Sequence, residues 1–387
     1  MAYKALKAAH LPFELVRSED IKKGALFGYK LLFVPGGWAS NKIKTLGADG
    51  ILQIKEFVGR GGNYLGFCGG AGLATADGIG LLNIRRKPTK DRVPSFSGRI
   101  RLNLSEHPIW QDITDPVFHA WWPSQFLPDR DTNHLLAAYG AALPDSFSSD
   151  LNVGDTVRYG DWADSEKNYG INLNPERLLD DPAVVEGAFG DGKVLLSLVH
   201  FDTPEDSNGT LVLKNIWNYL QGMGNIDVHA DTEGPVGLVK DRVEQSLMDE
   251  LESAADELIS LGLRNFLWFW RNPMLLQWRR GVRGLEYCTL FTMIKEIAAL
   301  IRSGCNSSLI TSHSSRIKNL LLPFSDQAKR LLILERQAML SGPITYEMCN
   351  NPEIQKMRTW LFGNSKSHGG LFKELIDAVD ELLYSLL

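Results

Sequence analysis

Short apolar runs alternate with helix-like stretches up to about residue 224, and glycines mark most of the changes between them. The run YKLLFV at 29–34 predicts a buried strand, and apolar residues at helical spacing over 51–58 predict the helix that follows. NYLGF at 63–67 predicts a second strand, and the stretch from Gly69 predicts a second helix. Strands and helices in such short units are typical of a parallel sheet with helices on both faces. We therefore predict an α/β fold with a doubly wound, mostly parallel sheet.

Two later apolar runs predict an antiparallel addition to this sheet. AVVEGAF at 183–189 and KVLLSLVH at 193–200 flank Gly190-Asp191-Gly192, which is typical of a hairpin turn. A third segment, HAWWPSQF at 119–126, is dense in aromatic residues. We interpret it as core or domain-interface packing, and the wall of a ligand pocket is the alternative.

The sequence pattern changes from about residue 236 onwards. Apolar residues recur at helical spacing in four segments, and no strand pattern is present; these segments are 243–258, 284–303, 325–341 and 371–386. Ser325 is a plausible N-cap for the third of them. We therefore predict an all-helical bundle in this half.

These patterns divide the chain into two domains. We predict an α/β domain at 1–225 and a helical domain of unknown role at 236–387, joined by the polar segment DVHADTEGP at 227–235. Within the helical domain, RNFLWFWRNPMLLQWRR at 264–280 mixes arginines with tryptophans. We interpret it as a helix pair that packs on the α/β domain, and docking to a membrane surface is the alternative.

Composition excludes several classes of protein. The net charge of −5 is spread evenly, so neither half offers the basic surface of a nucleic-acid-binding protein. No apolar stretch reaches 18 residues and the start lacks the apolar core of a signal peptide, so we expect no membrane segment and a cytoplasmic location. The four cysteines are scattered without CxxC spacing, which predicts reduced thiols and neither a disulfide framework nor a zinc site.

One cysteine stands out by its setting in YLGFCGGAGLATADG at 64–78. Gly66 and Gly70 flank Cys68 as G-x-C-x-G, directly after a predicted strand. A sharp turn from strand to helix strains the residue at the corner and leaves room only for small neighbours. The N–H groups of the helix start stabilise a thiolate and can receive an oxyanion. We predict that Cys68 is a nucleophile; the alternative is a small buried hydrophobic residue.

A nucleophilic cysteine needs a base, and His200 ends the strand KVLLSLV. Sites in open parallel sheets form at the carboxyl ends of the strands. Asp202, two residues later, is placed to hold the far nitrogen of the imidazole, although Glu205 and Asp206 are close competitors. The sequence thus predicts a Cys68–His200–Asp202 triad, for which a structural histidine is the alternative.

Three segments together resemble the class I glutamine amidotransferase-like superfamily, and most of all the family named after the N-terminal domain of biotin-protein ligases. They are LLFVPGGW, IKEFVGRGGNYLGFCGGAGLA and VVEGAFGDGKVLLSLVHFD, within roughly residues 12–222. The resemblance implies a flavodoxin-like sheet, with Cys68 as nucleophile and His200 as base. It also implies an oxyanion hole formed by backbone N–H groups near Gly37 and at Gly69.

The chain departs from the family pattern in four ways. The acid is Asp202 where the family usually has glutamate, and Gly72 stands where glutamine amidotransferases carry a glutamine four residues after the nucleophile. The stretch YKALKAAH comes before FELV at 13–16, whereas the family begins with a strand, so either the start is truncated or the sheet is rearranged. No biotinyl-adenylate loop is present, so biotin ligation is not the predicted activity.

We predict a cysteine hydrolase that acts on a small-molecule or peptide amide other than free glutamine, without metal or cofactor. The expected substrate pocket contains Trp38, Gly70, Trp121 and Trp122. The alternative function is a catalytically silent binding or regulatory protein that retains the fold and engages a protein partner through its helical domain.

Overall fold

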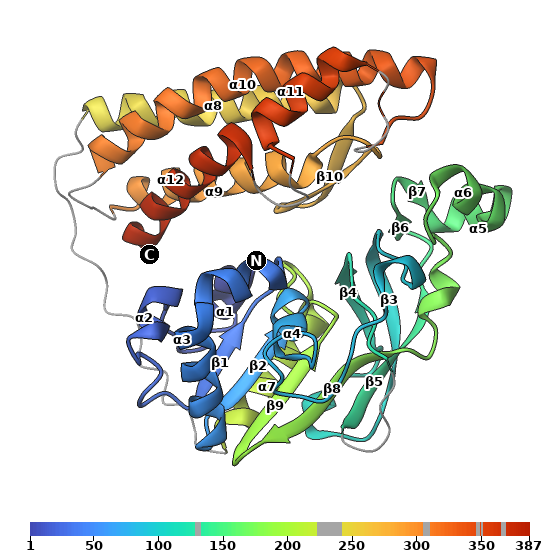
Figure 1. Ribbon diagram of the computed structural model, residues 1–387, viewed down its shortest axis with the longest axis vertical. Helices are drawn as coiled ribbons and strands as arrows, with labels where there is room; N and C mark the ends of the chain where they lie inside the picture. The colour runs from blue at the N-terminus through green and yellow to red at the C-terminus, as the bar shows by residue number, and fades with distance from the viewer. Residues whose placement is uncertain (128–132, 223–241, 305–309, 346–348, 350, 365–368) are drawn as a thin grey trace. The chain divides into compact units, whose positions relative to one another are not determined.

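The chain forms two compact units, Met1–Val228 and His229–Leu387. The computed structural model describes all residues except 128–132, 223–241, 305–309, 346–348, 350 and 365–368 (Figure 1). The predicted linker at 227–235 lies outside the described residues.

The first unit is built on a mixed sheet with the strand order β1-β2-β9-β8-β5-β3-β6-β7, in which β4 pairs with β3. The strands are β1 (Leu31–Val34), β2 (Asn63–Phe67), β3 (Phe96–Leu104), β4 (Val117–Trp121), β5 (His134–Ala142), β6 (Phe147–Ser148), β7 (Leu151–Asn152), β8 (Pro182–Phe189) and β9 (Gly192–Ser197). Within the described residues β1, β2 and β9 pair in parallel, and all other pairs of this sheet are antiparallel. The α/β class and the β8–β9 hairpin are confirmed, and the antiparallel part extends well beyond that hairpin.

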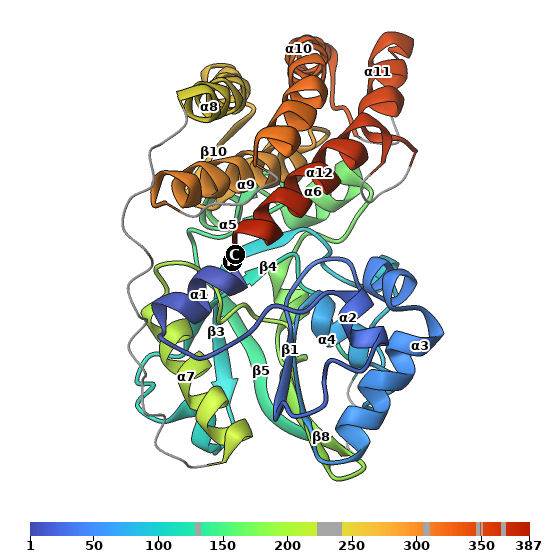
Figure 2. The same cartoon turned by 90° about the vertical axis from the view of Figure 1, so that its left-hand side faces the viewer.

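Helices cover both faces of the parallel strands. In Figure 2 the helix α7 (Ser207–Gln221) lies on one side of the sheet, and α3 (Ala39–Gly59) and α4 (Gly69–Ala74) lie on the other. The remaining helices of this unit are short; they are α1 (Ala2–Ala8), α2 (Ser18–Lys22), α5 (Val153–Tyr159) and α6 (Trp162–Tyr169). The helices on both faces explain why β2 and β9 read as continuous apolar runs, since successive residues are buried from Tyr64 to Phe67 and from Val194 to Ser197.

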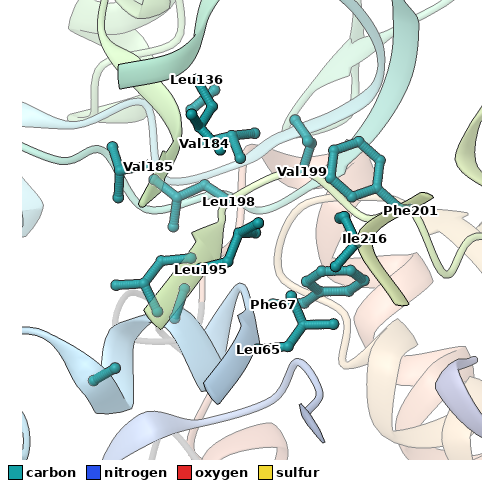
Figure 3. Close-up of a cluster of buried hydrophobic side chains, with 14 of the residues drawn as sticks. Leu65, Phe67, Leu136, Val184, Val185, Leu195, Leu198, Val199, Phe201 and Ile216 are labelled. Carbon is teal, nitrogen blue, oxygen red and sulfur yellow. The ribbon is translucent and has the colours of Figure 1, made fainter. Parts of the chain in front are cut away.

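The core of this unit lies against the parallel strands. Leu65 and Phe67 of β2 and Leu195 of β9 are fully buried beside Phe201 and Ile216, which come from the segment after β9 and from α7 (Figure 3). The Phe67 and Phe201 rings meet edge to face, with their centroids 5.6 Å apart. Burial of each such side chain contributes about 1.5–3 kcal/mol, so this packing fixes the strand ends from which the site is built.

The second unit is mainly helical and has its own apolar core. Its helices are α8 (Arg242–Arg264), α9 (Gly284–Arg302), α10 (Ile310–Ser341), α11 (Pro352–Phe362) and α12 (Gly370–Leu386). The prediction of α10 placed its start wrongly: the helix runs through Pro323, and Ser325 is a buried interior residue instead of an N-cap. Its hydroxyl faces the Ala254 carbonyl at 3.5 Å.

The prediction of helices alone is wrong at 264–280. The strands β10 (Trp268–Asn272) and β11 (Leu275–Trp278) form an antiparallel hairpin there. The Asn272 side chain accepts a hydrogen bond from the Met274 N–H at 2.8 Å, a local turn that competes with helix. The buried Trp268 indole donates to the Ile259 carbonyl at 3.0 Å, so the aromatic residues anchor the hairpin on α8. None of the helices in the described part of the chain is both long and apolar enough to cross a membrane.

Candidate functional site

Cys68 occupies the corner between β2 and α4. Its φ of +48° is in the region that residues with a Cβ rarely adopt, which confirms the predicted strain. The flanking glycines are required by contact: a Cβ on Gly66 would lie 2.7 Å from the Gly70 carbonyl carbon, and one on Gly70 would lie 1.9 Å from the Val34 carbonyl oxygen. The Cys68 N–H donates to the Ser197 carbonyl at 2.7 Å, which ties the corner to the end of β9.

His200 follows β9 at the same edge of the sheet, because β9 runs parallel to β2. Its N–H donates to the His119 carbonyl at 2.8 Å, in the middle of β4. Its own carbonyl accepts from the Thr203 hydroxyl at 2.9 Å, and that hydroxyl accepts from the Trp121 indole N–H at 2.9 Å. The turn that carries His200 is therefore held from β4 as well as from β9.

Asp202 is the acid that contacts His200. The distance from His200 Nδ1 to Asp202 Oδ1 is 2.9 Å, and both side chains are buried. The competitor Asp206 instead accepts from Gly209 N–H as the N-cap of α7 and lies 2.7 Å from His119 Nδ1. Of the candidate acids, Asp202 is thus the one at hydrogen-bonding distance from the His200 ring.

Electrostatics around His200 favour its charged form. Burial lowers the pKa of His200, but the Asp202 carboxylate and the neighbouring Cys68 sulfur more than offset this and raise the pKa to about 10. Burial acts to raise the pKa of Asp202, yet the imidazolium brings it below its ordinary value. Histidine and aspartate therefore form a buried ion pair next to the Cys68 sulfur.

The loop after β1 completes the surroundings of Cys68. A Cβ on Gly36 would lie 2.9 Å from His200 Cε1 and 3.8 Å from Cys68 Cβ, so the loop backbone passes directly over the pair. Gly37 has a φ of +104°, and a Cβ on Gly69 would overlap its carbonyl oxygen at 1.7 Å. Gly37 and Gly69, the two predicted oxyanion-hole residues, are therefore neighbours beside Cys68. The Gly69 N–H belongs to the first turn of α4 and has no acceptor within that helix.

The predicted pocket residues have different environments. Trp38 is the N-cap of α3 and is 46% exposed, whereas Trp121 is buried and stacks on the His119 ring with centroids 5.4 Å apart. Trp122 has a φ of +49° and packs against Trp121. Gly70 is enclosed by the end of β1. Contact of these four residues with a substrate stays a prediction.

Three cations that sequence reasoning missed surround this corner. Lys42 Nζ of α3 is 3.7 Å from the position of a Cβ on Gly37, and Arg86 Nη1 is 2.7 Å from the position of a Cβ on Gly72. Burial lowers the pKa of Lys42, and the charge of Cys68 opposes this effect. Burial and Arg86 likewise lower the pKa of Arg92, and Cys68 again opposes them. No sequence motif marks these cations, because two separate segments, α3 and the connection from α4 to β3, bring them together.

The other cysteines and the acidic residues provide no second centre in the described residues. Cys68, Cys288 and Cys349 are free thiols, and Cys305 lies outside those residues. Within the part of the chain that the structure describes, no group of three or more histidine, cysteine, aspartate or glutamate side chains is arranged to hold a metal ion.

Comparisons with known proteins give structural similarities at low sequence identity. No curated protein matches the sequence. A glutamine amidotransferase structure is similar at 20% identity and a TM-score of 0.36, covering 57% of this chain and 92% of that one. A cytoplasmic protein from Salmonella typhimurium is similar at 13% identity and a TM-score of 0.35, and the match covers 57% of this chain and 85% of that one. A β-galactosidase from Bacillus circulans is similar at 14% identity and a TM-score of 0.34, and the match covers 57% of this chain and 26% of that one.

A family model places the resemblance on the segment that carries Cys68. The model described as "Biotin-protein ligase, N terminal" matches residues 26–77. That range includes the Gly36-Gly37 loop, Cys68 and Gly72, while His200 and Asp202 lie beyond it. From β1 through α4, the chain is therefore similar to the N-terminal domain of biotin-protein ligases, as its sequence predicted.

Proposed function

We propose that the first unit is a thiol-dependent acyl-transfer enzyme, most simply a hydrolase of amides, that acts through Cys68, His200 and Asp202. The observation that carries this proposal is the 2.9 Å contact between His200 Nδ1 and Asp202 Oδ1, beside a cysteine held at a positive φ. A buried ion pair of this kind has a desolvation cost, and apolar side chains could stabilise a purely structural turn without that cost. Its position next to a strained thiol gives it a chemical use.

The chemistry starts from the raised pKa of His200, which keeps the imidazole positively charged beside the Cys68 sulfur. A neighbouring imidazolium stabilises the thiolate form of a cysteine, which is the nucleophile of the proposed reaction. The thiolate attacks the amide carbonyl, and the N–H groups near Gly37 and Gly69 receive the oxyanion. The C–N bond breaks as His200 gives its proton to the leaving nitrogen. Water then cleaves the thioester, its proton returns to His200, and the acid is released with the thiolate restored.

An activated ester tests the nucleophile without knowledge of the substrate. We expect p-nitrophenyl acetate to acylate the wild-type chain with a burst of about one p-nitrophenolate per chain. Cys68→Ala should lose this burst and slow turnover by at least about 1,000-fold. Cys288→Ala, the matched cysteine control, should keep both. A burst that persists in Cys68→Ala contradicts the proposal, and the absence of any burst in the wild-type chain favours the silent binding protein.

A further inference from the structure

Among the described residues, Lys42, Arg86 and Arg92 lie near Cys68 without an anionic partner, whereas several other cations of the first unit form ion pairs. Arg99 pairs with Asp145 and Arg177 with Glu166, each at 2.8 Å. Among the described residues no carboxylate lies within ion-pair distance of the side chains of Lys42, Arg86 or Arg92. The chain has an excess of acidic residues, so unpaired cations at a partly buried site need an explanation.

The guanidinium groups are also incompletely satisfied. Arg92 Nη1 donates to the Ser124 hydroxyl at 2.8 Å and Nη2 to the Thr89 hydroxyl at 2.6 Å, so neutral groups hold it in place. The Nε atoms of both Arg86 and Arg92 are buried and have no hydrogen-bond partner within the described structure. Unsatisfied buried donors are costly in a folded protein, and a ligand that accepts hydrogen bonds removes this cost.

The glycine at position 72 links this cluster to the thiol. The Gly72 N–H donates to the Cys68 carbonyl at 2.8 Å in the first turn of α4. The space that a side chain at this position would take is occupied by Arg86 Nη1. The family pattern places a glutamine side chain at this position, and in this chain the guanidinium group of Arg86 lies there instead. Such a group presents a planar fork of donors that matches carboxylate and phosphate.

We propose that Lys42, Arg86 and Arg92 bind an anionic group of the substrate, a carboxylate or a phosphate, next to the bond that Cys68 attacks. This inference rests on the proposed function and names its substrate class: amides whose acyl part is a net anion. Free glutamine fits poorly, because its ammonium group would lie among three cations. A dicarboxylic acid monoamide such as glutaramate has the same amide and carboxylate without the ammonium group.

Alkylation of Cys68 tests the anion site without requiring catalysis. Iodoacetate is anionic and iodoacetamide is neutral. The alkylation ratio is the rate with iodoacetate divided by the rate with iodoacetamide, so the intrinsic nucleophilicity of the thiol cancels. We expect this ratio to be at least about threefold higher in the folded chain than for the same cysteine in urea, because the cations attract the anionic reagent. Arg86→Gln and Arg92→Gln should each lower the ratio, and Arg86→Lys should retain most of it.

Arg60→Gln is the matched control, because Arg60 is an exposed arginine whose nearest carboxylate is Glu56, at 3.8 Å. It changes the net charge by the same amount and should leave the ratio unchanged. Glutarate and inorganic phosphate are then tested for protection of wild-type Cys68 against iodoacetamide, which distinguishes a carboxylate site from a phosphate site. A ratio equal to that in urea, or one that falls equally in Arg60→Gln, overturns the inference.

Ammonia release separates the two proposals. If both hold, the wild-type chain should hydrolyse glutaramate at least about tenfold faster than the neutral diamide glutaramide and faster than glutamine. Equal hydrolysis of all three, lost in Cys68→Ala, would support the acyl-transfer function and overturn the anion site. A raised alkylation ratio without hydrolysis would leave the anion site standing and contradict the enzyme.

Discussion

Two cysteines of this chain have nearly opposite surroundings. Cys68 stands at a strained corner beside an imidazolium and three cations, in the loops at one edge of a sheet. Cys288 is enclosed in the helix α9, 1% exposed, with its sulfur 3.1 Å from the Met274 carbonyl oxygen. Burial raises the pKa of Cys288 to about 11. A reactive thiol therefore depends on charge and access, whereas burial alone produces an inert one.

The largest expected difference between them is chemical reactivity. At neutral pH only about one Cys288 thiol in ten thousand would be ionised with a pKa of about 11, and the apolar core of the second unit encloses it. We expect iodoacetamide to label Cys68 at least about 100-fold faster than Cys288. Peptide mapping after brief labelling measures this. Preferential labelling of Cys288, Cys305 or Cys349 would contradict the comparison.

A smaller difference is expected in the dependence of stability on pH. The folded-state pKa of His200, about 10, is above the value of about 6.5 in an unfolded chain. A raised pKa gives stability that is fully present below about pH 6.5 and is lost as the pH rises towards 10. The loss attributable to His200 should be on the order of a few kcal/mol.

Two variants separate this effect from that of Cys288. Asp202→Asn removes the main anionic partner of His200, so it should lower the pKa of His200 and flatten the decline in stability between about pH 6.5 and 9. Cys288→Ala should leave the pH dependence of stability in that range unchanged. It should alter this dependence only above about pH 9, where the Cys288 thiol ionises in the unfolded chain but stays protonated in the folded one. Urea unfolding at a series of pH values measures both. Parallel profiles for the wild-type chain and Asp202→Asn would mean that Asp202 does not hold the proton on His200.

The sequence predicted the parts of the site that depend on local pattern. A strand followed by G-x-C-x-G predicts the corner at Cys68, and an H-x-D spacing after a strand predicts the contact of His200 with Asp202. The cations were missed because Lys42, Arg86 and Arg92 meet through tertiary packing of segments that carry no pattern of their own. The hairpin at 268–278 was missed for a different reason: its turn depends on the Asn272 side chain, which the aromatic and arginine composition obscured.

The smallest predicted effect is the difference in stability between a glycine and an alanine variant, and it has opposite signs at the two cysteines. At Cys68 the φ of +48° strains any residue with a Cβ, so Cys68→Gly should be more stable than Cys68→Ala by about 1 kcal/mol. Cys288 lies inside a helix, where glycine is less favourable than alanine by about 1 kcal/mol, so Cys288→Gly should be less stable than Cys288→Ala. Comparing glycine with alanine cancels the loss of the thiol at each site. Urea unfolding of the four variants at one pH measures the two differences. If both have the same sign, the corner at Cys68 is unstrained, and its reactivity must come from the neighbouring charges alone.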